Sequence, residues 1–151
     1  LLSGPNITKG YINNEEANKE LFIDGFLKTG DMGFFKDDNV IIIGRKKDIL
    51  FINGQNYYSH DIENIIGEKV GVNSANIVVC ALRSKEDKDE IIIFVKNDKS
   101  LKDMDGLKRQ IRNTVIKVIQ YPVSDVVIVD CIPKTGSGKK QRFKLLKDYS
   151  K

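Results

Sequence analysis

From residue 46 onward, the spacing of apolar residues switches repeatedly between two and about 3.6, and this switching limits the fold more than any other feature. Apolar runs typical of strands are Ile49–Ile52, Asn76–Leu82, Glu90–Val95 and Asp125–Ile132. Helical spacing follows Ser59, recurs over Met104–Ile119 and returns over about Arg142–Tyr149. This order predicts an α+β domain, with a small β-sheet, helices packed against it and a β-hairpin.

Local signals predict where these elements begin and end. Asn53-Gly54 favours a tight hairpin turn after the first strand. Ser59 is a predicted N-cap for the helix that follows, and Gly71 can close that helix. Ser84–Asp89 reads as a charged turn between two strands, and Pro122 stops the second helix.

The first 45 residues do not fit into this unit. Leu21–Phe26 and Val40–Ile43 are predicted strands, and Lys36–Asn39 is a predicted turn. We expect residues 1–45 to be the end of a preceding β-rich domain and residues 46–151 to be a separate domain. The chain begins at Leu1 rather than at a methionine, so we also expect it to be a piece of something longer.

Composition favours a soluble protein of a reducing compartment. The chain is 40% hydrophobic and 30% charged, which is ordinary for a globular protein. No apolar run approaches the roughly 20 residues that a membrane span needs. Cys80 and Cys131 each lie in an apolar run, which predicts two buried reduced thiols and a cytoplasmic location.

Basic residues are concentrated at the carboxyl end. Residues 134–151 hold seven Lys or Arg residues and one Asp, whereas residues 1–45 hold five basic and seven acidic residues. A basic tail can attract nucleic acid, an anionic surface or a phosphorylated ligand, or can simply be a solvated helix face. The glycine-rich run at 135–138 favours the phosphate-bearing ligand over nucleic acid.

Lys139 ends a loop of small residues that follows a predicted buried strand. The loop contains Thr135, Gly136, Ser137 and Gly138. Such residues allow close approach of the backbone to an anion, and a lysine supplies a compact positive charge. A Walker A loop is excluded, because Pro133 stands where its first glycine belongs and Lys140 where its Ser or Thr belongs. A purely structural loop remains the alternative.

Two further charged motifs precede this loop. Thr29-Gly30-Asp31 places a carboxylate after a predicted strand, where it could accept hydrogen bonds from a vicinal diol such as ribose; an ordinary turn is the alternative. Gly44–Asp48 gathers four charges at the predicted domain boundary and suits a hinge or an anion-facing edge. His60 has no Cys or second His near it, so we expect a structural role and no metal site.

In this order and at these separations, the motifs resemble those of the adenylate-forming (ANL) superfamily, which includes acyl-CoA synthetases, peptide-synthetase adenylation domains and firefly luciferase. Phe26–Asp31 resembles the family's "(W/F)-(L/F)-x-TGD" motif, and Gly44–Asp48 followed by Gly54 resembles its hinge region. Pro133–Lys139 with Arg142 resembles the terminal "PKT-SGK..R" motif. The resemblance extends upstream to Gly4-Pro5, Gly10-Tyr11 and Asn13, and so covers essentially the whole chain.

The resemblance implies a two-step reaction in which a carboxylate attacks the α-phosphate of ATP and a thiol then takes the acyl group. By similarity, Asp31 holds the ribose hydroxyls, Arg45 contacts the nucleotide and Lys47 is the hinge residue. Lys139 bridges substrate carboxylate and phosphate oxygens, while Gly54 lets the hairpin approach the thiol arm. Residues 46–151 then form the C-terminal lid, whose partner is the enzyme's own N-terminal domain.

The stretch Asn56–Glu63 looks most like the "N.YP.DIE" of fatty acyl-AMP ligases and related loading modules. That likeness implies a fatty or other carboxylic acid as substrate and the phosphopantetheine arm of an acyl or peptidyl carrier protein as acceptor. Two departures are Ser59, where proline is usual, and Phe51, where some relatives carry a lysine used in thiol transfer.

The family's phosphate loop, its acyl pocket and the residues that hold Mg²⁺ lie upstream of the motifs found here. We therefore expect this chain to be inactive by itself. The alternatives are an acyl-CoA synthetase that uses free CoA and a non-catalytic docking module that keeps the lid fold.

Overall fold

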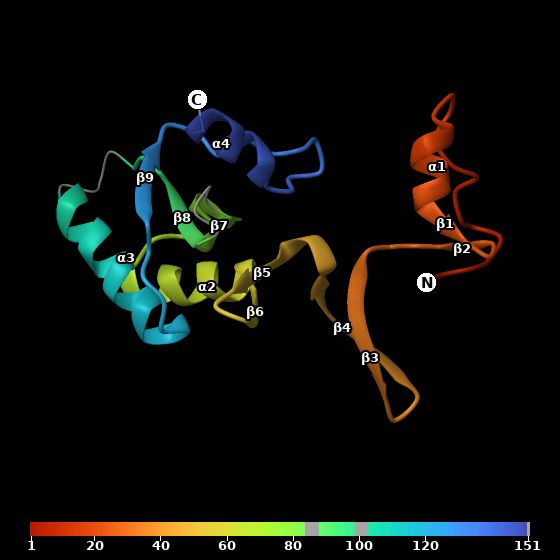
Figure 1. The fold of residues 1–151 in the computed structure, drawn as a ribbon, viewed down its shortest axis with the longest axis horizontal. Helices are drawn as coiled ribbons and strands as arrows, with labels where there is room; N and C mark the ends of the chain where they lie inside the picture. Colours follow the sequence, from red (N-terminus) through yellow and green to blue (C-terminus); the bar gives the residue numbers. More distant parts are fainter. Residues whose placement is uncertain (84–87, 99–102, 151) are drawn as a thin grey trace. The chain divides into compact units, whose positions relative to one another are not determined.

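The computed structural model describes residues 1–83, 88–98 and 103–150, and the chain divides into two compact units, Leu1–Lys47 and Asp48–Lys151 (Figure 1). This division lies two residues beyond the expected boundary. That the first unit is the end of a larger β-rich domain stays a prediction. The two units are described separately below.

The second unit is built on a three-stranded sheet of β7 (Ile77–Arg83), β8 (Asp89–Lys96) and β9 (Asp125–Val129) in the order β7-β8-β9. β7 and β8 are antiparallel, whereas β8 and β9 are parallel. A parallel pair needs a crossover connection, and α3 (Met104–Ile119) supplies it. The central strand is buried on both faces from Ile91 to Val95, which explains its uninterrupted apolar sequence.

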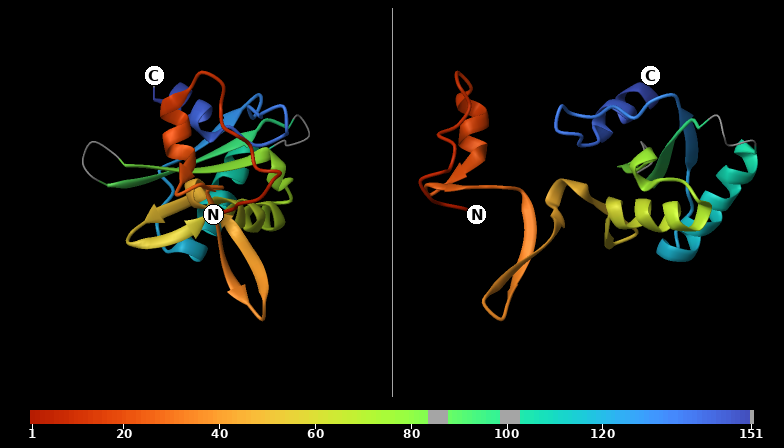
Figure 2. Two further views of the ribbon diagram at one scale, coloured as in Figure 1. Left: turned by 90° about the vertical axis from the view of Figure 1, so that its right-hand side faces the viewer. Right: turned by 180° about the vertical axis from the view of Figure 1, so that it is seen from behind.

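Helices cover both faces of this sheet (Figures 1 and 2). α2 (Ser59–Val70) and α3 pack on one face, where Ile66 and Ile111 meet Val79 and Ile93 in the larger apolar cluster. α4 (Arg142–Tyr149) lies on the other face, where Leu145 belongs to a smaller cluster with residues of β7 and β8. This arrangement confirms the predicted α+β fold.

The helix that contains Ser59 begins differently from the prediction. Ser59 is the first helical residue and the N-cap is Tyr58, which makes no side-chain capping bond. Strand β6 (Gln55–Tyr58) runs directly into the helix and turns the Ser59 hydroxyl inward, where it is buried and has no hydrogen-bond partner among the described residues. The predicted end is confirmed, because Gly71 adopts a left-handed conformation with φ of 73°.

The predicted hairpin is formed by β5 (Ile49–Ile52) and β6. Asn53 and Gly54 have φ angles of 49° and 77°, the left-handed conformations that a two-residue type I′ turn requires. Ile52 is buried in the larger cluster, whereas Phe51 on the opposite face is 58% exposed. The Asn53 N–H donates to Asp89 Oδ2 at 2.9 Å, which ties the turn to the start of β8.

The first unit contains α1 (Glu15–Leu21), β1 (Phe22–Ile23), β2 (Phe26–Leu27), β3 (Asp31–Lys36) and β4 (Asn39–Arg45). The predicted strand Leu21–Phe26 is wrong, because the chain turns back at Asp24 and Gly25, both with positive φ. The strand at Val40–Ile43 is confirmed within β4, which pairs with β3 across the predicted turn. α1 was not predicted. Its N-cap is Asn14, whose side chain accepts from the Ala17 N–H.

Two other sequence predictions concern the ends of strands in the three-stranded sheet. The strand predicted over Asp125–Ile132 ends at Val129, and Cys131 beyond it is exposed, so the prediction of two buried thiols holds only for Cys80. The turn predicted at Ser84–Asp89 falls largely on residues 84–87, which lie outside the described residues. In the part of the chain that is described, no helix is both long and apolar enough to cross a bilayer.

The two thiols should differ sharply in reactivity. Burial raises the pKa of Cys80 to about 12, so only about one molecule in 10⁴ carries its thiolate at pH 8. We expect one equivalent of iodoacetamide to react quickly at pH 8, with Cys131 as the modified residue in a peptide mass map. Cys80 should react only after denaturation; equal labelling of both residues in the folded chain would contradict the fold.

Gly67 lies inside α2, where alanine would ordinarily stabilise a helix. A Cβ atom there would lie 2.7 Å from the backbone oxygen of Val72. We therefore expect Gly67→Ala to lower the free energy of unfolding by about 1–3 kcal/mol, because backbone must move to make room. Asn64→Ala, on the exposed face of α2, is the matched control and should change stability by about 0.5 kcal/mol or less. Urea unfolding measures both.

Candidate functional site

Asp31 and Arg45, the two predicted nucleotide-binding residues, lie opposite each other on the β3–β4 hairpin. Arg45 Nε lies 3.1 Å from Asp31 Oδ1 in an ion pair, and both side chains are about one-third exposed. The Asp31 N–H donates to Thr29 Oγ1 at 3.1 Å, which holds the turn before the strand. The fold of the first unit therefore brings together two motifs that are 14 residues apart in the sequence.

A shallow pocket adjoins this ion pair. Its volume is about 280 Å³, and it is lined by Thr29, Gly30, Arg45, Lys46 and Lys47. Gly30 has φ of 76° and its carbonyl accepts from the Lys46 N–H at 2.8 Å. Lys47, the predicted hinge residue, is the last residue of the first unit. The pocket thus presents backbone of the TGD motif beside three basic residues.

The lysine loop, residues 133–140, is a closed turn in the second unit. Lys134 and Lys140 form an antiparallel bridge, and the Thr135 N–H donates to the Lys139 carbonyl at 2.8 Å. The Lys139 N–H donates to Thr135 Oγ1 at 3.1 Å, and the Gly138 N–H to the Thr135 carbonyl at 2.8 Å. These three amides bond within the loop and are not offered to an anion, whereas the Lys139 side chain is exposed.

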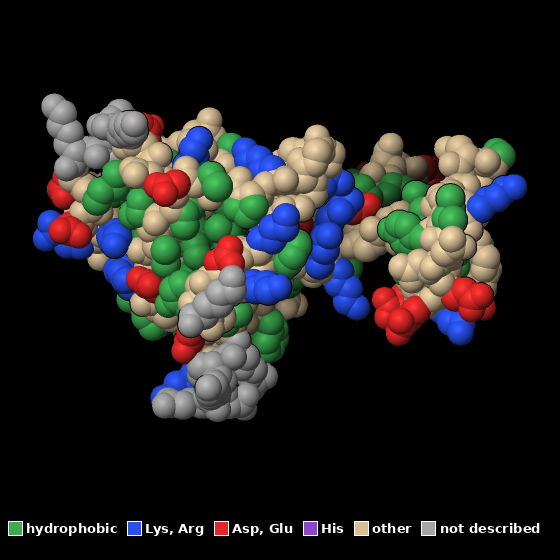
Figure 3. Space-filling model, turned by 90° about the horizontal axis from the view of Figure 1, so that it is seen from above, with side chains coloured by type: hydrophobic (Ala, Val, Ile, Leu, Met, Phe, Trp, Pro, Cys, Tyr) green, Lys and Arg blue, Asp and Glu red, His purple; other side chains and the backbone are tan. Residues whose placement is uncertain are grey.

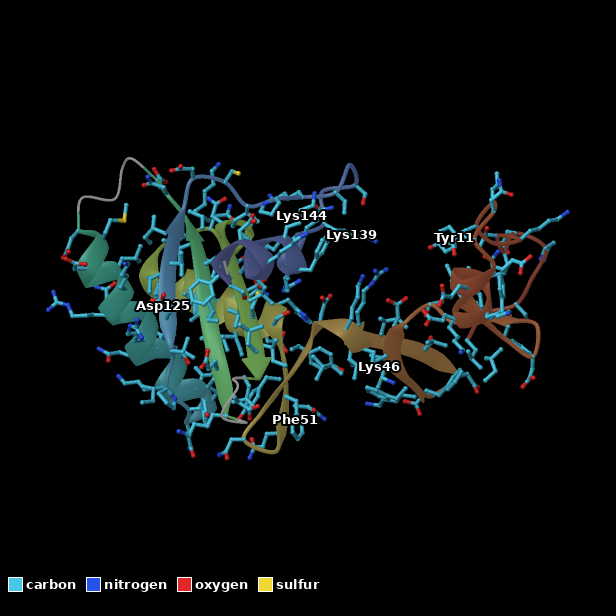
Figure 4. The ribbon with its side chains drawn as sticks, turned by 45° about the horizontal axis from the view of Figure 1, so that its top comes forward. Tyr11, Lys46, Phe51, Asp125, Lys139 and Lys144 are labelled. Carbon is cyan, nitrogen blue, oxygen red and sulfur yellow. The ribbon has the colours of Figure 1, made fainter. Side chains whose placement is uncertain are left out.

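The adjacent residues Lys139 and Lys140 point in opposite directions. Lys139 is exposed and extends away from the sheet (Figure 4). Lys140 turns inward, where its Nζ lies 2.7 Å from Glu63 Oε2 and its side chain is only 17% exposed. Arg142, at the start of α4, donates through NH2 to Glu63 Oε1 at 2.8 Å. The lysine loop is therefore attached to α2 by a buried carboxylate.

One face of the second unit carries side chains of both charges. On the face drawn in Figure 3, Lys and Arg side chains alternate with acidic and hydrophobic ones. The described residues contain no group of three or more His, Cys, Asp or Glu residues able to hold a metal ion. His60 lies beside Asp61, with 3.2 Å between Nε2 and Oδ1, and its ring contacts that of Tyr58.

Comparison with known proteins shows which enzymes the chain resembles. The chain is 35% identical, over its whole length, to 2-succinylbenzoate–CoA ligase of Listeria monocytogenes. It also matches the structure of McyG A-PCP complexed with phenylalanyl-adenylate, with a TM-score of 0.83 and 33% identity over 95% of this chain and 27% of that one. The chain is therefore similar to the C-terminal part of adenylate-forming enzymes. No protein-family model matches it.

The likeness covers one part of these larger proteins. The chain spans about a third of the curated relatives it matches, with 32% of the Listeria monocytogenes ligase covered. A structure from work on fatty acyl-adenylate ligases of E. coli and L. pneumophila matches 97% of this chain and 26% of its own, with a TM-score of 0.77 and 27% identity. The fold is that of the C-terminal domain of adenylation enzymes.

The predicted site residues are divided between the two units. Asp31, Arg45 and Lys47 belong to the first, whereas Gly54 and Lys139 belong to the second. At Gly54 no atom lies within 4 Å of the position that a Cβ atom would take, so that side of the turn is open.

Sequence reasoning missed the residue that holds the lysine loop. Glu63 was read only as part of a motif, yet its exposed fraction is 2%. Its position offered a signal, because Ile62 and Ile66 on either side of it are buried on the same helical stripe. A carboxylate on an apolar stripe needs a partner, and the basic residues of the terminal motif were the available cations.

Proposed function

We propose that this chain is the C-terminal portion of an ATP-dependent ligase that activates a carboxylic acid, in particular a fatty acid, as an acyl-adenylate. The acyl group then passes to the phosphopantetheine thiol of a carrier protein. The observation that carries the proposal is the exposed Lys139 ammonium on an internally bonded loop of an adenylation-enzyme lid. The ion pair of Asp31 and Arg45, beside the pocket lined by Thr29 and Gly30, supports the proposal.

In the first step, a carboxylate oxygen of the acid attacks the α-phosphorus of ATP. The bond from that phosphorus to the bridging oxygen breaks, and pyrophosphate leaves. Negative charge accumulates between the carboxylate and the α-phosphate, and the Lys139 ammonium would lie against these oxygens. A positive charge aimed at developing charge in a dry site contributes about 10²–10³ in rate.

In the second step, the thiol sulfur attacks the acyl carbonyl carbon, AMP leaves with the bonding electrons, and the thiol proton passes to solvent. Lys139 has no role in this step, so the lid would rotate about Lys47 and present the hairpin turn at Gly54. The open side of that turn leaves room for a thiol arm. Phe51 on the same hairpin offers an apolar surface, so a lysine-dependent transfer is not proposed there.

For the nucleotide, Asp31 would accept hydrogen bonds from the ribose hydroxyls. Its Oδ1 forms the ion pair with Arg45, and its Oδ2 is the oxygen left for a diol among the described contacts. Arg45 would contact the nucleotide from the same edge. The Mg²⁺ that neutralises ATP would be held by the enzyme's larger N-terminal domain, the main partner of this lid.

The thiol acceptor has two candidates. A carrier protein is favoured by the structural match to the McyG A-PCP protein and by the Asn56–Glu63 stretch. Free CoA is favoured by the sequence match to 2-succinylbenzoate–CoA ligase. Both readings share the adenylation chemistry. We also place the enzyme in the cytoplasm, because Cys80 and Cys131 are free thiols of the kind found in reducing compartments.

Replacing Lys139 by alanine in the complete enzyme should separate the two steps. We expect ATP–pyrophosphate exchange to fall about 10²–10³-fold, because the charge that stabilises the transition state is lost. Transfer from preformed acyl-adenylate to thiol should stay within about twofold.

Lys147→Ala removes a similar charge from the exposed face of α4 and serves as the matched control. Equal loss of both steps in Lys139→Ala would contradict an alternating lid. Unchanged exchange would favour the non-catalytic docking module. The isolated chain should give no exchange at all.

The acceptor is tested by offering the complete enzyme CoA and a phosphopantetheinylated carrier protein in separate reactions. We expect acylation of the carrier at least about tenfold faster, measured by intact-protein mass spectrometry, because a tethered arm raises the effective concentration of the thiol. The same carrier without its arm is the control. Transfer to CoA alone would replace our preferred acceptor by the second candidate.

A further inference from the structure

Lys140 uses every hydrogen-bond donor that its side chain has. Its ammonium donates to Glu63 Oε2 at 2.7 Å, to the Ser74 carbonyl at 2.7 Å and to the Ile77 carbonyl at 2.6 Å. An ammonium carries three N–H groups, so this set is complete. Lys140 therefore joins the end of the lysine loop to α2, to the short turn η2 (Ser74–Asn76) and to the start of β7.

Both carboxylate oxygens of Glu63 accept hydrogen bonds. Its Oε2 accepts from Lys140, and its Oε1 accepts from Arg142 NH2 at 2.8 Å and from the Val79 N–H at 3.0 Å. Arg142 NH1 also lies 3.3 Å from Asp48 Oδ1. Two carboxylates and two cations therefore form a charge-balanced cluster, which we call the anchor cluster: Asp48, Glu63, Lys140 and Arg142.

The anchor cluster restricts the loop that carries Lys139. Lys140 is the last residue of that loop, and its backbone pairs with Lys134 across the loop's base. The next N–H, that of Gln141, donates to the Pro133 carbonyl at 2.8 Å. The two sides of the loop's base are thus bonded to each other. The side that contains Lys140, next to Lys139, is fixed to the body of the second unit. A side chain on a base held this firmly reaches a smaller volume than one on a free loop.

We propose that Glu63, Lys140 and Arg142 are positioning residues, which hold the Lys139 ammonium where adenylation requires it and have no part in thiol transfer. This inference rests on the proposed function of Lys139. The cluster is poorly placed to bind a ligand itself, because the side chains of Glu63, Lys140 and Arg142 are only 3%, 17% and 20% exposed. A displacement of about 1 Å in a catalytic group can cost about 10²-fold in rate.

The first test measures loop order in this chain, without any reaction. In Lys140→Met, hydrogen exchange of the Thr135, Gly138 and Gln141 amides should become at least about tenfold faster, whereas α3 amides should be unchanged. Lys147→Met removes the same charge from the exposed face of α4 and should leave all these rates unchanged. Unchanged exchange in the loop of Lys140→Met would overturn the proposal.

The second test uses the complete enzyme and separates the half-reactions. Lys140→Met should lower kcat of ATP–pyrophosphate exchange about 10- to 100-fold with KM for ATP within about twofold, and transfer from preformed acyl-adenylate should be preserved. A purely structural role would lower both half-reactions together with the fraction of folded enzyme. Equal losses in a variant that is folded by circular dichroism would overturn the positioning role.

A charge-balanced variant keeps the test decisive if Lys140→Met does not fold. Glu63→Gln with Lys140→Met removes one charge of each sign and leaves no unpaired carboxylate in the cluster, so this double variant should fold. Its ATP–pyrophosphate exchange should fall, whereas transfer from preformed acyl-adenylate should be preserved. Equal losses of both half-reactions in the folded double variant would overturn the positioning role. Lys139→Ala separates the proposed function from the positioning role. If Lys139→Ala leaves adenylation unchanged, the proposed function fails, whatever hydrogen exchange shows for the loop amides.

Discussion

The buried carboxylate of Glu63 is the constraint on which the functional end of this chain depends. A carboxylate with 2% exposure is strongly unfavourable unless it is paired, and Lys140 and Arg142 pair it from the terminal motif. Removing one partner of such a buried pair typically costs about 3–5 kcal/mol, because the other charge stays buried. Helix α2, strand β7 and the lysine loop are therefore held at one point by groups that are 77 residues apart in the sequence.

How far the sequence predicted the fold depended on whether an element buries an apolar stripe. α3 was predicted within a residue because Leu107, Ile111 and Val115 are buried at helical spacing. α1 has no buried residue, so its sequence carries no apolar stripe, and it was not predicted. Ser59 was misassigned for a related reason, since a cap residue and a buried first-turn residue look alike until the strand before it is placed.

At the candidate site, the sequence did not predict which single residues lie opposite each other or which way their side chains point. Pairing outward from the Asp37-Asp38 turn in regular register would place Asp31 opposite Gly44, but an irregularity between Met32 and Gly33 places it opposite Arg45. Gly33 was the available signal, since an isolated glycine within a strand often marks a bulge, but it does not fix which residues then pair. Likewise, motif resemblance identified Lys139, but only the side-chain directions distinguish it from Lys140, which has the same chemistry one residue later.

The residues on either side of Lys47 are each held by contacts within their own unit, and this limits where the chain can rotate. The Lys46 N–H donates to the Gly30 carbonyl, which fixes residue 46 to the first unit. Asp48 is held by Arg142, which fixes residue 48 to the second unit and to the carboxylate that holds the lysine loop. Lys47 is the residue between these two attachments, so rotation about its backbone would leave both sets of hydrogen bonds intact. A pivot confined in this way would move Lys139 with the second unit as one rigid piece, which is what the role proposed for Lys139 in only one of two steps requires.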